Sequence, residues 1–382
     1  MHSTKGAMGP EAYTNFANNS LRDGGLPLLG WNHPSEYQHL VHQHWRNFPA
    51  PQIHFTAFFF IGYIILMFIS LFGNGLVIWI FGTSKNLRTP SNLLIFNLAI
   101  FDLVMCCNMP HYLINTIAGY FIGGELSCDV YAVLGGISGM GAAISNAFIA
   151  FDRYRTISNP IDGRLNFAQV GFLIAFCWVW TIPFSVLPFF KIWGRYTAEG
   201  YLTTCSFDYL TDNDETRLFV RSMFAWAYCF PMIMICTYYT KLFLHVRDHE
   251  RMLAEQAKKM NVKSLSANAN TESMSVEMRI AKAAIMIWML YVVAWTPYAT
   301  VSLLGTSDNR QAITPFVSML PATAAKAVSC FDPWVYAASH PKYRLELERR
   351  LPWLGIRERN IQGGGSAATC NDSEAGTVMV ES

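Results

Sequence analysis

Residues 313–336 read ITPFVSMLPATAAKAVSCFDPWVY, an apolar stretch whose single basic residue is Lys326. About twenty apolar residues in a row predict a membrane-spanning helix, because that length crosses the roughly 30 Å of hydrocarbon in a bilayer. An ammonium group near the middle of such a helix costs about 2.5–3.5 kcal/mol, so it is kept only when it is paired, chemically modified or used. We therefore expect the function of the chain to depend on what Lys326 is attached to.

The remainder of the chain has the same character. Of its 382 residues, 52% are hydrophobic and 14% are charged, which favours a chain surrounded by lipid over a soluble globular protein. Seven apolar stretches are long enough to cross a membrane: residues 55–81, 92–117, 130–150, 167–190, 219–244, 280–304 and 313–338. The sequence predicts an all-α membrane protein, a seven-transmembrane helix bundle over residues 53–340. Membrane lipid is its expected environment, and nucleic acid is not an expected partner.

The basic residues predict which way the bundle faces. They gather in the segments after the first, third, fifth and seventh spans, and by the positive-inside rule these segments lie in the cytoplasm. Residues 1–52 then lie outside the cell. This outer segment contains Asn18-Asn19-Ser20, a glycosylation sequon. A sequon also arises by chance, but its predicted position outside the cell favours Asn18 as a glycosylated residue.

Three polar segments have predicted structures of their own. Residues 247–277, between the fifth and sixth spans, are predicted as helical extensions joined by a mobile loop. Residues 341–353 place Tyr343, Leu347 and Leu351 on one face, which predicts a short amphipathic helix on the inner membrane surface. Residues 354–382 are rich in Gly, Ser and Thr and are predicted to be disordered. This tail is either a phosphorylation target or a plain flexible end.

Two of the nine cysteines are predicted to form a disulfide. Cys128 stands at the outer end of the third span and Cys205 in the loop after the fourth, so both face the oxidising side of the membrane. No metal-ligand spacing with a histidine is found for six others, Cys106, Cys107, Cys177, Cys229, Cys236 and Cys330. We interpret them as packing residues and expect no metal site.

Several polar residues and prolines interrupt the apolar spans. Asn74, Asp102 and Asp332 can hydrogen-bond to one another if the first, second and seventh spans are neighbours. They are either polar links between helices or a switch that rearranges on activation. Prolines inside spans bend helices around a central cavity, and the sequence places them at Pro183, Pro188, Pro231, Pro297 and Pro333.

Together these residues resemble a known family. The resemblance is to the rhodopsin-like G-protein-coupled receptors, and it covers residues 55–352. It rests on Asn74, Asp102, Asp152-Arg153-Tyr154 at the inner end of the third span, Trp295-Thr296-Pro297, and Asp332-Pro333-Trp-Val-Tyr336. Lys326, six residues before Asp332, narrows the resemblance to the opsins. Residues 150–157 and the run from His340 to Arg344 are similar to the arthropod rhabdomeric visual opsins, particularly the short-wavelength, blue-sensitive type.

The resemblance implies a covalently bound cofactor. A lysine amine in an apolar pocket is readily deprotonated and then forms an imine with an aldehyde. The implied aldehyde is 11-cis-retinal or a hydroxylated derivative, joined to Lys326. A protonated imine needs a negative partner, and vertebrate visual relatives place a carboxylate where this chain has Tyr131. Glu199, six residues before Cys205, matches the alternative counterion of rhabdomeric opsins; otherwise it is an ordinary solvated loop residue.

Further pocket residues are implied by the same match. At the position of Asn108, ultraviolet-sensing relatives carry Lys, whose charge keeps the imine unprotonated. A neutral amide there predicts a protonated imine that absorbs blue light, unless Asn108 only hydrogen-bonds Tyr131 or the backbone. Trp295 and Tyr298, one helical turn apart, are expected to face the cofactor, and Pro297 is expected to act as a hinge.

The inner face carries the implied signalling residues. Asp152 and Arg153 are expected to form an ion pair that holds the resting state. The run His340-Pro341-Lys342 matches a motif for coupling to Gq-class G proteins. Otherwise it is a break between two helices, with Lys342 extending toward lipid phosphates. Arrestin and a receptor kinase are further implied partners, and the rhabdomere of a photoreceptor cell is the implied location.

The resemblance predicts a bistable visual photoreceptor and not an enzyme, and it disfavours three other classes of protein. A receptor for a diffusible ligand has no reason to keep Lys326. A retinal photoisomerase keeps Lys326 but does not need the motifs of the inner face. A transporter is disfavoured because the sequence has no evident inverted repeat.

Overall fold

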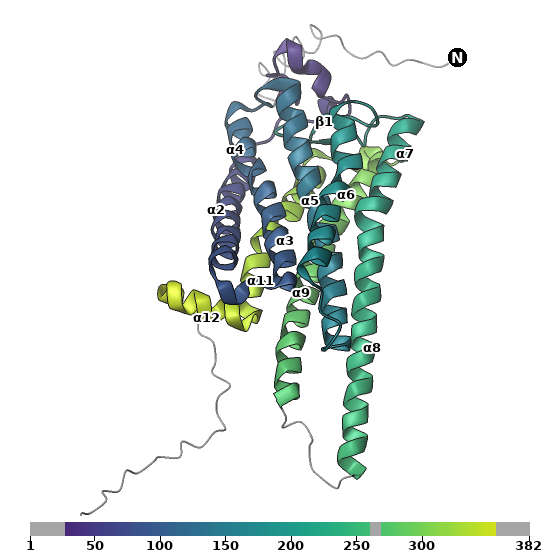
Figure 1. Ribbon diagram of the computed structural model, residues 1–382. Helices are drawn as coiled ribbons and strands as arrows, with labels where there is room; N and C mark the ends of the chain where they lie inside the picture. Colours follow the sequence, from purple (N-terminus) through teal and green to yellow (C-terminus); the bar gives the residue numbers. More distant parts are fainter. Residues whose placement is uncertain (1–26, 260–268, 357–382) are drawn as a thin grey trace, which may run out of the picture.

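The computed structural model describes residues 27–259 and 269–356, so Asn18 lies outside the described residues. Its long helices run side by side and form one bundle (Figure 1). The helices are α2 (Ile53–Thr83), α3 (Pro90–Cys106), α4 (Asn108–Ala118), α5 (Gly124–Ser158), α6 (Phe167–Phe189), α7 (Asp214–Met223), α8 (Phe230–Lys259), α9 (Ala269–Gly305), α10 (Pro315–Ala327), α11 (Asp332–Ser339) and α12 (Pro341–Arg350). The strands are β1 (Tyr196–Glu199) and β2 (Thr204–Phe207). We call the end with the two strands the hairpin end and the opposite end the α12 end.

Six helical spans within the described residues are long and apolar enough to cross a membrane. They correspond to the first six predicted spans, and each begins and ends within a few residues of its prediction or extends beyond it. The seventh predicted span is not one continuous helix. It is divided into α10, a 3-10 turn at Val328–Cys330, and α11.

Pro333 explains the division of the seventh span. Proline has no N–H group, so it leaves the carbonyl of Ser329, four residues earlier, without a helical donor. The side chain of Asn74 on α2 supplies that donor, with its Nδ2 atom 2.7 Å from the Ser329 oxygen. The break begins two residues after Lys326. A neighbouring helix satisfies its free carbonyl, as irregular backbone at membrane depth requires.

Two other prolines accompany irregular backbone. The second span divides at Cys107, between α3 and α4, three residues before Pro110, a proline absent from the predicted set. A π-helical turn at Phe224–Cys229 precedes Pro231, whose missing N–H frees the carbonyl of Ala227. Both irregularities adjoin the interior of the bundle, so they determine where the next side chains point.

The two strands form an antiparallel hairpin in which Glu199 is paired with Thr204 and Ala198 with Cys205. The predicted disulfide between Cys128 and Cys205 is present and ties β2 to α5. The turn of the hairpin needs glycine at residue 200, where φ is +62° and a Cβ atom would lie 2.6 Å from the Met319 side chain. The hairpin is thus fixed to both α5 and α10.

Residues 27–52 pack on the hairpin end, which the sequence did not indicate. Val41 forms a parallel bridge with Ala198 of β1, and the Trp45 side chain is fully buried. His44 Nε2 lies 2.7 Å from the carbonyl oxygen of Ile313, just before α10. This segment, seen above the bundle in Figure 1, covers the hairpin from outside.

At the other end, α12 lies across the bundle, whereas α8 and α9 extend past it (Figure 1). Tyr343 and Leu347 are buried against α2, and the Tyr343 ring stacks on Phe81 at a centroid distance of 5.3 Å. Arg350 donates hydrogen bonds to Thr83 Oγ1 and Ser84 Oγ at 2.6 and 2.8 Å. These contacts fix the short helix to the end of α2.

The buried carboxylate of Asp208, just after β2, predicts a pH-dependent contribution to stability. Burial opposes its charged form, but hydrogen bonds from Thr211 and from backbone amides, together with the charge of Arg195, outweigh burial and lower the pKa of Asp208. Asp208→Asn should therefore destabilise the protein by about 1–3 kcal/mol at pH 7. Because the pKa is lower in the folded state, this difference should disappear as the pH falls below about 4.

Thermal unfolding of the detergent-solubilised protein across this pH range measures the effect of Asp208→Asn. Asp212→Asn is the matched control, since Asp212 is half exposed and pairs with Arg217 and Arg310 on the surface. Exposed ion pairs contribute about 0–1 kcal/mol to the free energy of unfolding, so Asp212→Asn should cost less than Asp208→Asn. Equal losses in the two variants would contradict the account of Asp208.

Candidate functional site

A cavity lies in the half of the bundle nearer the hairpin end. Residues of α3, α4, α5, α6, α7, α9, α10 and both strands line it. All six residues that the sequence assigned to a pocket are among them: Asn108, Tyr131, Glu199, Trp295, Tyr298 and Lys326. The structure therefore brings together residues from segments up to 218 positions apart in the sequence (108 to 326).

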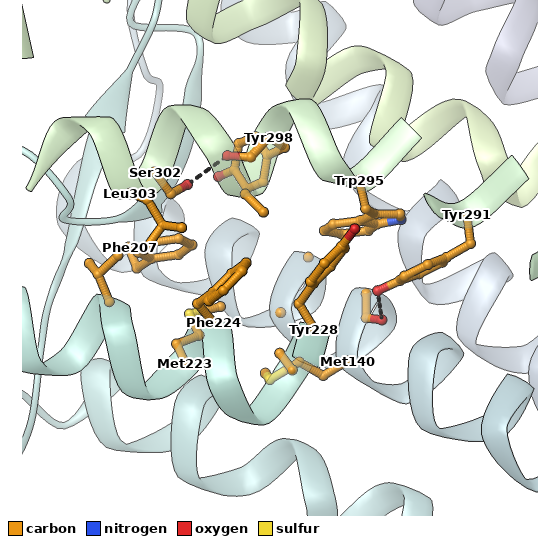
Figure 2. Close-up of a pocket in the computed structure, with 16 residues that line it drawn as sticks. Met140, Phe207, Met223, Phe224, Tyr228, Tyr291, Trp295, Tyr298, Ser302 and Leu303 are labelled. Atoms are coloured by element: carbon orange, nitrogen blue, oxygen red, sulfur yellow. Dashed lines mark hydrogen bonds between the residues drawn. The ribbon is translucent and has the colours of Figure 1, made fainter. Parts of the chain in front are cut away.

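A second cavity adjoins the first. Both are lined by Gly136, Phe207, Trp295 and Tyr298, so we treat them as one elongated space, the central chamber. Figure 2 shows Trp295 and Tyr298 on α9 facing Phe224 and Tyr228 across this space. An elongated, mainly apolar space with few polar groups suits a long apolar ligand.

Several chamber residues were not found from the sequence. Phe207, Phe224, Tyr228 and Tyr291 line the second cavity. Each belongs to a stretch rich in aromatic residues, and aromatic residues in membrane spans usually serve in packing or at the membrane interface. Phe207 is the last residue of β2, and Phe224 and Tyr228 lie in the π-helical turn. At such positions the sequence does not indicate which way a side chain points.

Lys326 lies at the wall of the chamber, with 9% of its surface exposed. Its Nζ atom is 5.8 Å from the centre of the Tyr131 ring. The carboxylate of Glu199 is the charged group that acts on it electrostatically. The amine thus faces an aromatic ring on α5, and the carboxylate that acts on it belongs to the hairpin.

Glu199 is the last residue of β1 and is 3% exposed, so it is not a solvated loop residue. Tyr209 donates a hydrogen bond to its Oε2 atom at 3.1 Å, and the Tyr209 hydroxyl also contacts Ser318 Oγ of α10 at 3.0 Å. Burial raises the pKa of Glu199, while the charge of Lys326 and hydrogen bonds from Tyr209 and Tyr298 act in the opposite direction. A positive charge in the chamber therefore favours the ionised carboxylate.

Asn108 and Tyr131 present unsatisfied polar atoms to the chamber. Asn108 is 0% exposed, and neither its amide nitrogen nor its oxygen has a hydrogen-bond partner among the described residues; the same holds for the Tyr131 hydroxyl. The alternative that Asn108 only bonds Tyr131 or the backbone is therefore not what the structure contains. Because an unpaired buried polar group costs about 1–3 kcal/mol, a polar group that enters the chamber fits here.

The polar residues of the spans divide into two groups. Asn74 donates to the backbone of Ser70 and Ser329, at 3.1 and 2.7 Å, and so joins α2 to the seventh span. Asp102 and Asp332 are buried and interact with each other through their carboxyl groups. The predicted contact between the two aspartates is present, whereas Asn74 binds backbone carbonyls.

At the α12 end, Asp152 and Arg153 form the expected ion pair, and both side chains are buried. Ser91 of α3 donates to Asp152 Oδ1 at 2.9 Å, and the Tyr154 ring stacks on Tyr238 of α8. The Tyr336 side chain lies outside the described part of the structure. His340, Pro341 and Lys342 form the beginning of α12.

The fold and the chamber define a membrane receptor, and comparisons with known proteins agree. Residues 73–336 match the family described as 7 transmembrane receptor (rhodopsin family). The chain is 67% identical over 361 residues to opsin Rh5 of Drosophila melanogaster, covering 94% of each chain. It is 56% identical over 341 residues to the blue-sensitive opsin of Apis mellifera, covering 89% of this chain and 90% of that one. The crystal structure of squid rhodopsin superposes with a TM-score of 0.78 at 32% identity, covering 84% and 92% of the two chains.

The chain belongs to the rhodopsin family of seven-transmembrane receptors. Within that family it is a short-wavelength arthropod visual opsin, a multi-pass membrane photoreceptor and not an enzyme. It takes a retinal chromophore and acts through a heterotrimeric G protein. The amine of Lys326, the carboxylate of Glu199 and the unsatisfied atoms of Asn108 and Tyr131 fit such a chromophore in the central chamber.

The contact between Asn74 and Ser329 generates a prediction about stability. Asn74→Ala leaves the Ser329 carbonyl without its donor and should cost about 1–3 kcal/mol of stability. If the freed carbonyl is the cause, Pro333→Ala restores a backbone N–H that can bond to it. The cost of Asn74→Ala should then be smaller when Pro333 is replaced. Thermal unfolding of the four proteins in a double-mutant cycle measures this coupling; strictly additive losses would contradict it.

Proposed function

We propose that this opsin is a blue-absorbing, bistable visual pigment that couples to a Gq-class G protein. Its chromophore is 11-cis-retinal or a hydroxylated derivative, bound covalently to Lys326. The observation that carries the proposal is the enclosure of Lys326 and Glu199 in one chamber whose other walls are mainly apolar. Retinal supplies the absorption of light and the change of shape that follows, and the chain supplies the environment.

Glu199 acts as the counterion. A positive charge on the Lys326 nitrogen needs a compensating negative charge in this buried setting. Glu199 supplies it from the hairpin, and Tyr209 with Ser318 orients the carboxylate. Because an aromatic ring, Tyr131, faces Nζ from α5, the compensating charge comes from Glu199 of the hairpin.

Asn108 tunes the colour. Its uncharged amide leaves the positive charge on the Lys326 nitrogen in place, whereas a lysine there would repel it. Groups that stabilise that charge favour the ground state and shift absorption to shorter wavelength. Overall similarity does not decide the colour, because the chain is 56% identical to the blue-sensitive and 51% identical to the ultraviolet-sensitive opsin of Apis mellifera. The residue at position 108 is therefore the basis for the blue assignment.

Trp295 transmits the change of shape. Its ring packs directly on α5, since a Cβ atom at Gly139 would lie 2.4 Å from the Trp295 ring. Pressure on this ring displaces α9, and Pro297 gives α9 a point at which its inner half swings outward. That movement opens the α12 end, where the pair of Asp152 and Arg153 holds the resting arrangement. Release of Arg153 then permits binding of the G protein.

The remaining assignments follow from the orientation that the basic residues predict. We propose that residues 1–52 lie outside the cell with Asn18 glycosylated, that residues 53–340 form the bundle, and that residues 341–353 rest on the cytoplasmic membrane surface. Residues 354–382 form a cytoplasmic tail that a receptor kinase and arrestin recognise. The protein is located in the rhabdomere membrane of photoreceptor cells.

The counterion assignment is tested by absorption spectra of protein reconstituted with 11-cis-retinal in the dark. The wild type should show a blue band that light converts to a stable second form, reversible by a second colour, and Lys326→Ala should show no pigment. Glu199→Gln removes the negative charge, so the imine should lose its proton at a lower pH. The pH at which the visible band gives way to ultraviolet absorption should fall by about one to three units relative to the wild type. Glu125→Gln is the control, because Glu125 is an exposed carboxylate at the same end, paired with Lys191. A titration of Glu199→Gln that matches the wild type would remove Glu199 from this role.

The colour assignment is tested at position 108. Asn108→Lys introduces a second positive charge beside Nζ and should move the absorption into the ultraviolet. Asn108→Ala keeps the position neutral but removes the polar group, so it should shift the visible band to longer wavelength. Both spectra are recorded in the dark at neutral pH. If Asn108→Lys retains a visible band, this explanation of the colour is wrong.

A further inference from the structure

The run His340-Pro341-Lys342 is expected to act as one unit in coupling, but its two ionisable side chains have opposite surroundings. The His340 ring is 5% exposed, whereas Lys342 is exposed. A side chain that is buried in the receptor cannot form the same kind of contact with a partner as one that is exposed. The two residues therefore have different roles.

His340 caps α12. Its Nδ1 atom accepts a hydrogen bond from the backbone N–H of Tyr343 at 3.2 Å, which satisfies one of the free donors at the helix start. Burial, and then the charges of Arg153, Lys342 and Arg279, lower the pKa of His340 to about 4. The ring is neutral at physiological pH and can accept this bond. Its edge also packs on Phe81 of α2, with ring centroids 6.0 Å apart.

The cap determines how α12 sits on the bundle. Pro341 follows at the first helical position, where its fixed φ favours the helix and its missing N–H removes no bond. The capped residue is Tyr343, the same side chain that stacks on Phe81. His340 and Tyr343 thus hold the start of α12 against one ring of α2, and Lys342 between them points outward.

Lys342 belongs to a group of cations at the α12 end. The charges that act on His340 come from Arg153 on α5, Arg279 on α9 and Lys342 on α12. Lys342 is exposed before any movement, so its charge is available to an approaching partner. An exposed cation in this position fits an anionic surface on the G protein.

We propose that the tripeptide divides into a positioning residue and a contact residue: His340 caps and places α12, and Lys342 forms the contact with an acidic surface of the Gq-class G protein. This inference rests on the proposed Gq coupling. It assigns no partner contact to His340. Any residue that caps a helix equally well should replace His340, whereas Lys342 requires its charge.

The experiment compares four variants of the full-length receptor reconstituted with 11-cis-retinal. His340→Asn keeps a favoured capping side chain, and His340→Ala removes it. Lys342→Ala removes the proposed contact, and Arg349→Ala removes an exposed cation elsewhere on the same helix as the matched control. Three quantities are measured: the dark absorption spectrum, hydrogen exchange of the backbone amides of residues 343–347, and the rate of light-dependent nucleotide exchange on purified Gq at two salt concentrations.

We expect all four spectra to match the wild type. His340→Ala should increase exchange at residues 343–347 and slow Gq activation, and His340→Asn should restore both. Lys342→Ala should leave exchange unchanged, slow Gq activation about five- to tenfold at low salt, and weaken its salt dependence. Arg349→Ala should activate Gq at the wild-type rate.

Two results would overturn the inference. One is a loss of activation in His340→Asn while residues 343–347 remain protected, since His340 would then contact the partner itself. The other is wild-type activation by Lys342→Ala. If the wild-type receptor forms a pigment but activates no Gq, the proposed coupling fails. The exchange measurements then still decide whether His340 caps α12.

Discussion

One positive charge in an apolar bundle is the constraint on which the rest of the structure depends. The Lys326 amine faces the ring of Tyr131 on α5, and the carboxylate that acts on it electrostatically is Glu199 of the hairpin. Glu199 reaches the chamber only because the hairpin folds into the end of the bundle. The disulfide from Cys128 to Cys205, the packing of residue 200 against Met319 and the bridge between Val41 and Ala198 all hold the hairpin there. The structure of the hairpin end is therefore part of the electrostatics of the chamber.

The seventh span joins that charge to the opposite end of the molecule. It carries Lys326 at the chamber, then the 3-10 turn, then Asp332 and Pro333, and finally His340 at the start of α12. Asn74 and Phe81, both on α2, contact this path at its break and at its end. The first helix thus contacts the seventh span at its break and the start of α12 beyond it.

The sequence predicted those features that depend on length, charge or a single residue type. The length of the apolar spans predicted the bundle, and a basic residue within the seventh span singled out Lys326. The pairing of Cys128 with Cys205 was predicted because both lie on the same, oxidising side of the membrane. It did not reveal the packing of Trp45, because residues 27–52 are polar on average and one buried ring leaves no periodic signal. It also missed Tyr228 and Tyr291 in the chamber, since in an apolar span every face is apolar and only the neighbouring helices decide which one faces inward. The roles of Glu199 and Asn108 are still predictions, although both side chains lie where those roles need them.

Prolines connect the irregular backbone to the site. Each removes a donor and frees a carbonyl, and a span within lipid has to satisfy that carbonyl in another way. For Pro333, the side chain of Asn74 bonds to the freed carbonyl of Ser329, and the resulting 3-10 turn follows Lys326. The break before Pro110 directly precedes Asn108, and the π-helical turn before Pro231 contains Tyr228. Asn108, Tyr228 and Lys326 all line the chamber. A bundle of regular helices would present the same side chains at other angles, so these three irregularities shape the chamber as much as the residues that line it.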